Sequence, residues 1–240
     1  MATFLRSDQS LCEDEIISHF PIRFKNYYEP FLKHGQIFFN LYKNGRIFQK
    51  AFLSSSDKNL INAYQAVRDE PERLQKMILR YCASNSKQFF ENMKQAISTP
   101  SAYIYVNRAS SPDGKWRERD FIDRNKQISK DVECIDRCSS YLNRWCQWVF
   151  HTDWEAALTN ANDGDVVYLE PPRIPWTVDG RIDYATGSFS EANQVYLRNY
   201  TEQLKKRGCK VFMLQSNVPA TERIFDKPAH MLSNGNCLYV

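Results

Sequence analysis

Hydrophobic residues in this chain occur in short unbroken runs and in longer stretches with helical spacing. Val166–Leu169 consists of four consecutive apolar or aromatic residues, which is typical of a strand buried on both faces. Similar runs at residues 27–28, 51–55, 148–150 and 210–214 predict further strands. Because helical patterns separate these runs, we predict an α/β fold with a largely parallel sheet.

In residues 60–145 the hydrophobic positions recur with the spacing of helices, and no strand pattern is evident. Leu60, Ala63, Tyr64 and Val67 recur at intervals of three and four residues, as on one face of a helix. We therefore predict an α/β core formed by residues 1–59 and 146–240, interrupted by a helical insertion at residues 60–145. Residues 102–108 are predicted to form a buried helix with a polar tip.

Several predicted helices begin at side chains that can cap them. Thr152 and Glu155 have the spacing of a capping box and predict a helix over residues 153–160. Asp57 precedes a helix predicted at residues 58–68. It also follows the second strand, where α/β folds often place a carboxylate for a ribose hydroxyl. The sequence leaves the cap and the ribose ligand equally open for Asp57.

A carboxylate ends the strand at 166–169. Pro171 and Pro172 have no N–H groups for a sheet ladder, so the strand must stop and leave Glu170 at its carboxyl end. Ligands of open α/β sheets bind at this edge. The alternative for Glu170 is a strand end closed by an ordinary turn.

Composition narrows the class of protein. Of the 240 residues, 42% are hydrophobic and 25% charged, as in a globular domain. No apolar run is long enough for a membrane span, and no signal-peptide pattern is evident. Seven scattered cysteines and four histidines lack metal-ligand spacing, so we expect reduced thiols, no metal and a cytoplasmic protein. The net charge of +4 permits nucleic acid as a partner without requiring it.

Six stretches in order resemble the Dam-type DNA adenine methyltransferases. They are YYEPF (27–31), SSSDKNLINAYQAVRDEPE (54–72), AYIYVNR (102–108), TDW (152–154), GDVVYLEPP (164–172) and FSEANQVYLRNYTEQLKKRGCKVFMLQSN (189–217). The resemblance implies a Rossmann-like class I methyltransferase core with a helical target-recognition insertion. It also implies S-adenosylmethionine as cofactor and DNA as partner.

The resemblance assigns roles to individual residues. It places the catalytic motif at Glu170, Pro171, Pro172 and Arg173, and the cofactor site at Phe31, Gly35, Asp57 and Asp153. It places DNA contacts at Asn107, Arg108, Lys115, Trp116, Arg117 and Arg119. Acidic neighbours such as Glu118 and Asp120 dilute the charge of the basic residues in this loop.

The chain departs from the family where the chemistry is carried out. The family motif is Asp-Pro-Pro-Tyr, whereas this chain has Glu170-Pro171-Pro172-Arg173. Glutamate adds about 1.5 Å of reach at a site that tolerates a misplacement of about 0.5 Å, and Arg173 adds a cation beside a sulfonium donor. The glycine-rich cofactor turn reads Leu32-Lys33-His34-Gly35, and residues 3–16 contain no glycine.

Three hypotheses follow. In the first, the chain is a catalytically inactive or impaired methyltransferase that acts by binding DNA or a protein partner such as an active relative. In the second, it is an active adenine methyltransferase in which Glu170 accepts the hydrogen bond of the amine and Arg173 stacks on the base. In the third, it is a structural or assembly protein that uses the fold without nucleic acid. The altered motifs favour the first, so we do not expect an efficient enzyme.

Overall fold

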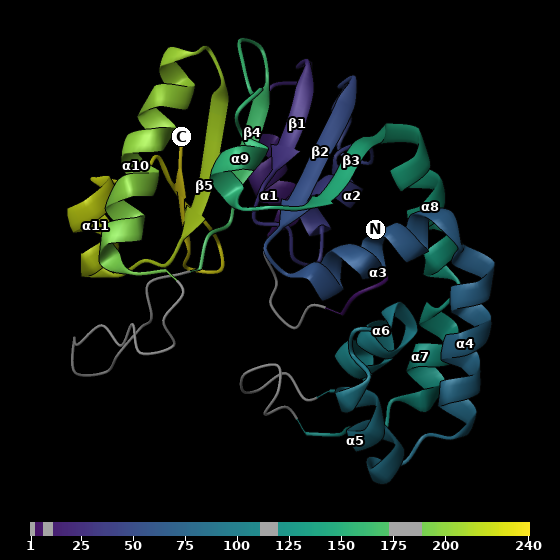
Figure 1. Cartoon of the computed structure of the whole chain (residues 1–240). Helices are drawn as coiled ribbons and strands as arrows, with labels where there is room; N and C mark the ends of the chain where they lie inside the picture. Colours follow the sequence, from purple (N-terminus) through teal and green to yellow (C-terminus); the bar gives the residue numbers. More distant parts are fainter. Residues whose placement is uncertain (1–2, 7–11, 111–119, 173–188) are drawn as a thin grey trace.

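A computed structural model describes residues 3–6, 12–110, 120–172 and 189–240 (Figure 1). Its strands are β1 (Asn26–Glu29), β2 (Lys50–Ser55), β3 (Cys146–His151), β4 (Val166–Leu169), β5 (Lys210–Gln215), β6 (His230–Met231) and β7 (Cys237–Tyr239). All of the strands predicted from apolar runs are therefore confirmed. The Arg173 position and the loop at 111–119 lie outside the described residues.

The strands form one mostly parallel sheet in the order β3-β2-β1-β4-β5-β7-β6. Strands β1 to β5 pair in parallel, and β7 runs antiparallel to β5. The chain winds from β1 outward through β2 to β3, and then returns to β4 on the other side of β1. This is a Rossmann-like topology, and its switch point lies between β1 and β4, where such folds bind ligands.

Successive residues of the central strands enter two separate cores. Tyr27, Val166 and Tyr168 belong to the core on one face, while Tyr28 and Val167 belong to the core on the other. All four residues of β4 are fully buried, as its unbroken apolar pattern predicts. Helices on both faces of the sheet thus fix the position of the strand ends.

Helices cover the sheet and extend beyond it. They are α1 (Glu13–Ser18), α2 (Gln36–Asn40), α3 (Lys58–Asp69), α4 (Pro71–Ala83), α5 (Lys87–Gln95), α6 (Pro100–Ala109), α7 (Asn125–Asp131), α8 (Cys134–Trp145), α9 (Trp154–Ala157), α10 (Glu191–Lys206) and α11 (Pro219–Phe225). Helices α3 to α8 lie between β2 and β3 in the chain and extend below and to the right of the sheet in Figure 1. None of the helices in the described ranges combines the length and hydrophobicity needed to cross a bilayer.

The predicted capping box at Thr152 is wrong. The backbone N–H of Thr152 still donates to the Ser55 carbonyl and continues the pairing of β3 with β2. The cap is Asp153, whose side chain accepts a hydrogen bond of 2.8 Å from the Ala156 N–H. Helix α9 consequently starts at Trp154 and ends at Ala157, before the predicted end at residue 160.

Candidate active site

A pocket of about 290 Å³ opens at the carboxyl ends of the parallel strands, and we name it the strand-end pocket. Each of the first four strands contributes to its lining. Phe31 and Lys33 follow β1, Ser55 and Ser56 end β2, Asp153 and Trp154 follow β3, and Glu170 and Pro172 follow β4. Phe189 and Asn193, at the start of α10, close one side. The pocket therefore lies at the switch point that the topology predicts.

Lys33 reaches into this pocket and contacts the acid of the double-proline motif. Its Nζ lies 3.1 Å from Oε1 of Glu170 and donates a hydrogen bond to it. The Glu170 side chain is only 9% exposed and that of Lys33 is 40% exposed, so the pair is partly shielded from water. Such charge-assisted contacts are stronger than those at an open surface. The departure from the glycine-rich turn thus places an ammonium group directly on the candidate catalytic carboxylate.

The double-proline corner is held by two buried glutamines. Gln194 of α10 donates to the carbonyl of Pro172 at 2.8 Å, and Gln215, which ends β5, donates to the side-chain oxygen of Gln194 at 3.0 Å. Both glutamines are fully buried. This chain of hydrogen bonds connects β5, α10 and the motif, and it fixes the backbone that positions Glu170.

A second acid, Glu29, lies buried at the end of β1. Its Oε2 accepts a hydrogen bond of 2.9 Å from the Tyr27 hydroxyl. Burial, reinforced by the charge of Glu170, raises the pKa of Glu29 to about 8, although the Tyr27 hydrogen bond and Lys33 act in the opposite direction. Glu29 is therefore mostly neutral at pH 7.

Aromatic rings form the other end of the strand-end pocket. The ring of Phe31 stacks on that of Trp154 with centroids 5.9 Å apart, and Phe189 meets Phe31 edge-on at 5.8 Å. Asp153 stands beside them with an exposed side chain. A flat aromatic ligand with a hydrogen-bond donor suits such a surface. Phe31 and Asp153, both predicted from the resemblance, are thus brought together in one pocket.

Gly35 and Asp57, the other predicted cofactor residues, do not line the strand-end pocket. Asp57 caps α3 by accepting hydrogen bonds from the N–H groups of Asn59 and Leu60, and its second oxygen accepts one from the Tyr103 hydroxyl. The structure therefore favours the plain cap over the ribose ligand. At this strand end the pocket is lined by Ser55 and Ser56, which were not predicted as site residues although they lie in the matched stretch at 54–72.

The glycine at position 35 is required by packing inside the protein. Its φ is +64°, and a Cβ placed there would lie 2.5 Å from the hydroxyl oxygen of Tyr64. That hydroxyl also donates to the Lys33 carbonyl at 3.2 Å. Gly35 therefore shapes the turn carrying Lys33 through its contact with Tyr64, and the pocket does not need its missing side chain.

Replacing Gly35 with alanine is expected to lower the free energy of unfolding by about 2–3 kcal/mol, from the strained φ together with the contact on Tyr64. Gly45 is the matched control, because its φ is +67° and nothing lies within 4 Å of a Cβ there. Gly45→Ala should lose only about 1 kcal/mol. Urea denaturation of both variants measures the difference, and equal losses would show that Tyr64 does not constrain position 35.

The predicted DNA-contacting pair, Asn107 and Arg108, points into the protein. The two residues are 4% and 6% exposed. The Asn107 side-chain oxygen accepts from the Arg6 N–H at 2.6 Å. Arg108 donates to the carbonyls of Thr3 and Phe4 and forms an ion pair of 2.6 Å with Asp131. In this structure the pair connects the N-terminal segment to α6 and α7, and both side chains are buried.

The remaining predicted site residues cannot be placed. All five lie outside the described residues: Lys115, Trp116, Arg117 and Arg119 in the segment 111–119, and Arg173 in the segment 173–188. Other pocket residues, among them Trp154, Phe189 and Asn193, were also missed as site residues in the sequence. These three lie in the stretches TDW and FSEAN that carry the family resemblance, which was the available signal.

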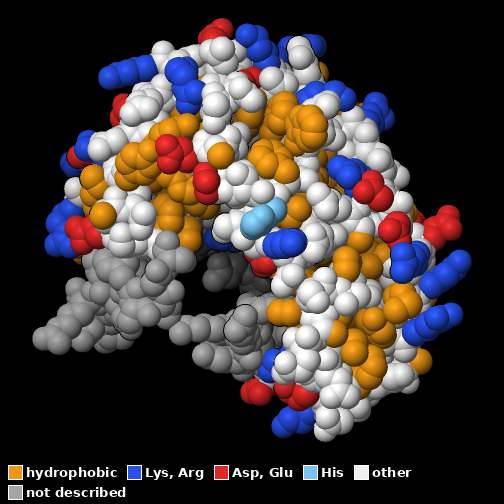
Figure 2. All heavy atoms as spheres, viewed as in Figure 1, with side chains coloured by type: hydrophobic (Ala, Val, Ile, Leu, Met, Phe, Trp, Pro, Cys, Tyr) orange, Lys and Arg blue, Asp and Glu red, His pale blue; other side chains and the backbone are white. Residues whose placement is uncertain are grey.

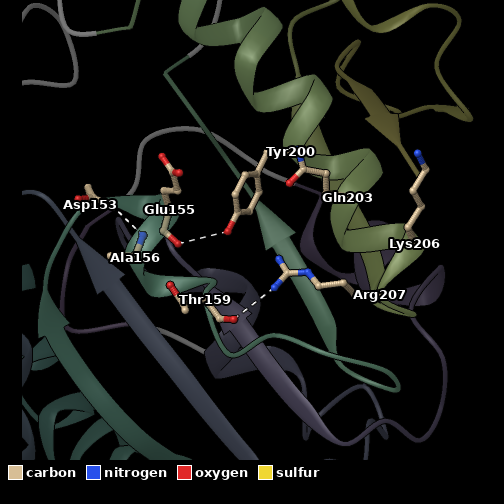
Figure 3. A pocket seen from close by; sticks show the side chains of 8 residues that line it. All are labelled: Asp153, Glu155, Ala156, Thr159, Tyr200, Gln203, Lys206 and Arg207. Atoms are coloured by element: carbon tan, nitrogen blue, oxygen red, sulfur yellow. Dashed lines mark hydrogen bonds between the residues drawn. The ribbon is translucent and has the colours of Figure 1, made fainter.

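A second pocket, of about 700 Å³, lies between α9 and α10 (Figure 3). Tyr200 and Arg207 extend from α10 toward α9, where they donate to the carbonyls of Glu155 and Thr159. Asp153 lines this pocket as well as the strand-end pocket. Its charges are mixed and its hydrogen bonds are made within the protein, so we assign it no ligand. Among the residues that the structure describes, no group of His, Cys, Asp and Glu is arranged to hold a metal ion.

Comparison with known proteins finds a matching family and a curated relative. Residues 123–236 match the family of D12 class N6 adenine-specific DNA methyltransferases. The chain is therefore similar to the DNA adenine methyltransferases. It is also 26% identical to the type II methyltransferase M1.LlaDCHI of Lactococcus lactis subsp. cremoris, across 85% of this chain and 77% of that protein.

The similarity to DNA adenine methyltransferases gives the site its chemical context. The family implies S-adenosylmethionine as methyl donor and DNA as substrate. The aromatic end of the strand-end pocket, with Phe31, Trp154 and Asp153, fits the flat adenosyl part of such a cofactor. The end at Glu170 does not fit a sulfonium, because the carboxylate of Glu170 is already paired with the ammonium group of Lys33, whose positive charge repels another cation.

Proposed function

We propose that this chain is a DNA-binding member of the adenine methyltransferase family that does not transfer methyl groups. The observation that carries the proposal is the contact between Lys33 and Glu170, 3.1 Å long. In an adenine methyltransferase of this family, the motif carboxylate must accept a hydrogen bond from the amine to be methylated. Here that carboxylate is engaged by an ammonium group, and the same positive charge opposes a sulfonium donor.

The charge distribution supports DNA as the partner. Residues 60–145 contain 15 Lys and Arg against 11 Asp and Glu, so the insertion carries a formal charge of +4, equal to that of the whole chain. Figure 2 shows basic side chains projecting from this part of the molecule, with acidic ones among them. Phosphate contacts from such a surface bind DNA without reading its sequence. We propose that residues 60–145 are the DNA-contacting unit.

Two further points of the proposal concern partners and location. The large hydrophobic side chains that are exposed, such as Ile22, Leu79, Trp148 and Tyr196, are distributed over different elements, which does not favour an assembly protein with one apolar docking face. All seven cysteines are free thiols, which supports a reducing compartment such as the cytoplasm.

Methyl incorporation and DNA binding must be measured on the same protein. With labelled S-adenosylmethionine and adenine-containing DNA, we expect incorporation no higher than in duplexes lacking adenine, and no change in Glu170→Ala. A gel shift should be present and should weaken as salt rises.

Each contrary outcome identifies one alternative. Adenine-dependent incorporation that is lost in Glu170→Ala would establish an active methyltransferase with an atypical motif. A protein that neither methylates nor shifts DNA at low salt would leave the assembly role as the better hypothesis.

A further inference from the structure

The strand-end pocket has two chemically different ends. Asp153 follows β3 and Glu170 follows β4, and the strand order places β2 and β1 between these two strands. Adjacent strands are about 4.8 Å apart, so the two acids stand about 14 Å apart along the edge of the sheet. An elongated ligand can therefore place an aromatic group at one end and a charged or polar group at the other.

Among the residues that the structure describes, the end at Glu170 contains nearly balanced charges. Lys33 contributes one positive charge and Glu170 one negative charge, with 3.1 Å between their atoms. Burial raises the pKa of Glu29 to about 8, so this third group adds little negative charge at pH 7. A carboxylate alone would attract a cationic ligand, whereas the pair gives such a ligand no net attraction and places an ammonium group beside it.

The charge on sulfur distinguishes the two forms of an adenosyl cofactor. S-adenosylmethionine carries a sulfonium cation, and S-adenosylhomocysteine has the same skeleton with one methyl group fewer and a neutral thioether. The aromatic end cannot tell the two apart, because their adenosyl parts are identical. Any preference must therefore arise at the end that contains Lys33.

We propose that Lys33 makes the strand-end pocket selective for the neutral thioether, S-adenosylhomocysteine, over the sulfonium, S-adenosylmethionine. This inference rests on the proposed function, because both depend on the contact of Lys33 with Glu170. The inference goes beyond the proposed function because it names the ligand of the site.

Titration calorimetry with the two compounds tests the selectivity on the full chain. In the wild type we expect the dissociation constant of S-adenosylhomocysteine to be at least about tenfold lower than that of S-adenosylmethionine. Lys33→Met removes the charge at similar length and should shift the ratio of the two constants by about tenfold or more toward S-adenosylmethionine. Lys33→Arg keeps the charge and should keep the wild-type preference. Thermal melting checks that both variants are folded.

Three results would overturn the inference: wild type that binds S-adenosylmethionine as tightly as the thioether, an unchanged ratio in Lys33→Met, or no binding of the thioether at all. The incorporation assay separates this failure from that of the proposed function. Lost selectivity without methyl transfer removes the inference alone, and methyl transfer with selectivity intact removes the proposed function alone.

Discussion

Replacing Arg108 with alanine is expected to lower the free energy of unfolding by about 3 kcal/mol or more. The guanidinium group is 6% exposed and donates to the carbonyls of Thr3 and Phe4 as well as to Asp131. Its removal takes a charged donor from two buried carbonyls, of which that of Thr3 keeps only the weaker Cys134 thiol, and it takes the cation from Asp131. Breaking one partner of a buried pair costs about 3–5 kcal/mol. Urea denaturation measures the loss.

The matched control is Arg137→Ala, because Arg137 has the same charge and lies exposed on α8. Its effect on stability should be within about 0.5 kcal/mol. DNA affinity should change little in Arg108→Ala at temperatures where the variant is folded. If Arg108→Ala left stability unchanged and weakened DNA binding, Arg108 would instead contact DNA, as the family resemblance implies.

The strand-forming runs could be read from the sequence because burial on both faces leaves no alternative to apolar residues. The four residues of β4 are the clearest case, and the two prolines after them fix where the strand ends. The order of the strands gave the position of the pocket, since the carboxyl ends of parallel strands meet at one edge. These features depend on local patterns and on topology rules, and the sequence contains both.

The roles of individual polar residues were harder to predict, because they depend on partners far apart in the chain. Arginine is a residue type that often contacts DNA, so Arg108 suggests such a role in the sequence. Only the fold shows that its side chain donates to the carbonyls of residues 3 and 4. Gly35 looks like a glycine that admits a cofactor, and only the fold places Tyr64 against it. In the sequence Lys33 is only one departure from the glycine-rich turn, and only the fold brings its ammonium group to Glu170.

The free energy of unfolding should fall as pH rises from about 4.5 to 8, owing to Glu29. The pKa of this carboxyl is raised from 4.5 to about 8 in the folded protein, chiefly by burial. Between these two values the folded state holds a proton that the unfolded state has released, so unfolding becomes easier with each unit of pH. Below pH 4.5 and above pH 8 this contribution is constant. At about 1.4 kcal/mol per pH unit, the full span of about 3.5 units is about 5 kcal/mol.

Glu29→Gln isolates this contribution, because the amide oxygen can still accept the Tyr27 hydrogen bond and the side chain has no proton to lose. Urea denaturation at pH 5, 6.5 and 8 should show the variant gaining stability relative to wild type as pH rises, while Glu72→Gln, at an exposed position, shows no such trend. A constant difference between Glu29→Gln and wild type would mean that Glu29 is ionised in the folded protein. In that case the site would contain two carboxylates and one ammonium at pH 7, and the net negative charge would favour a sulfonium, against the selectivity inferred for Lys33.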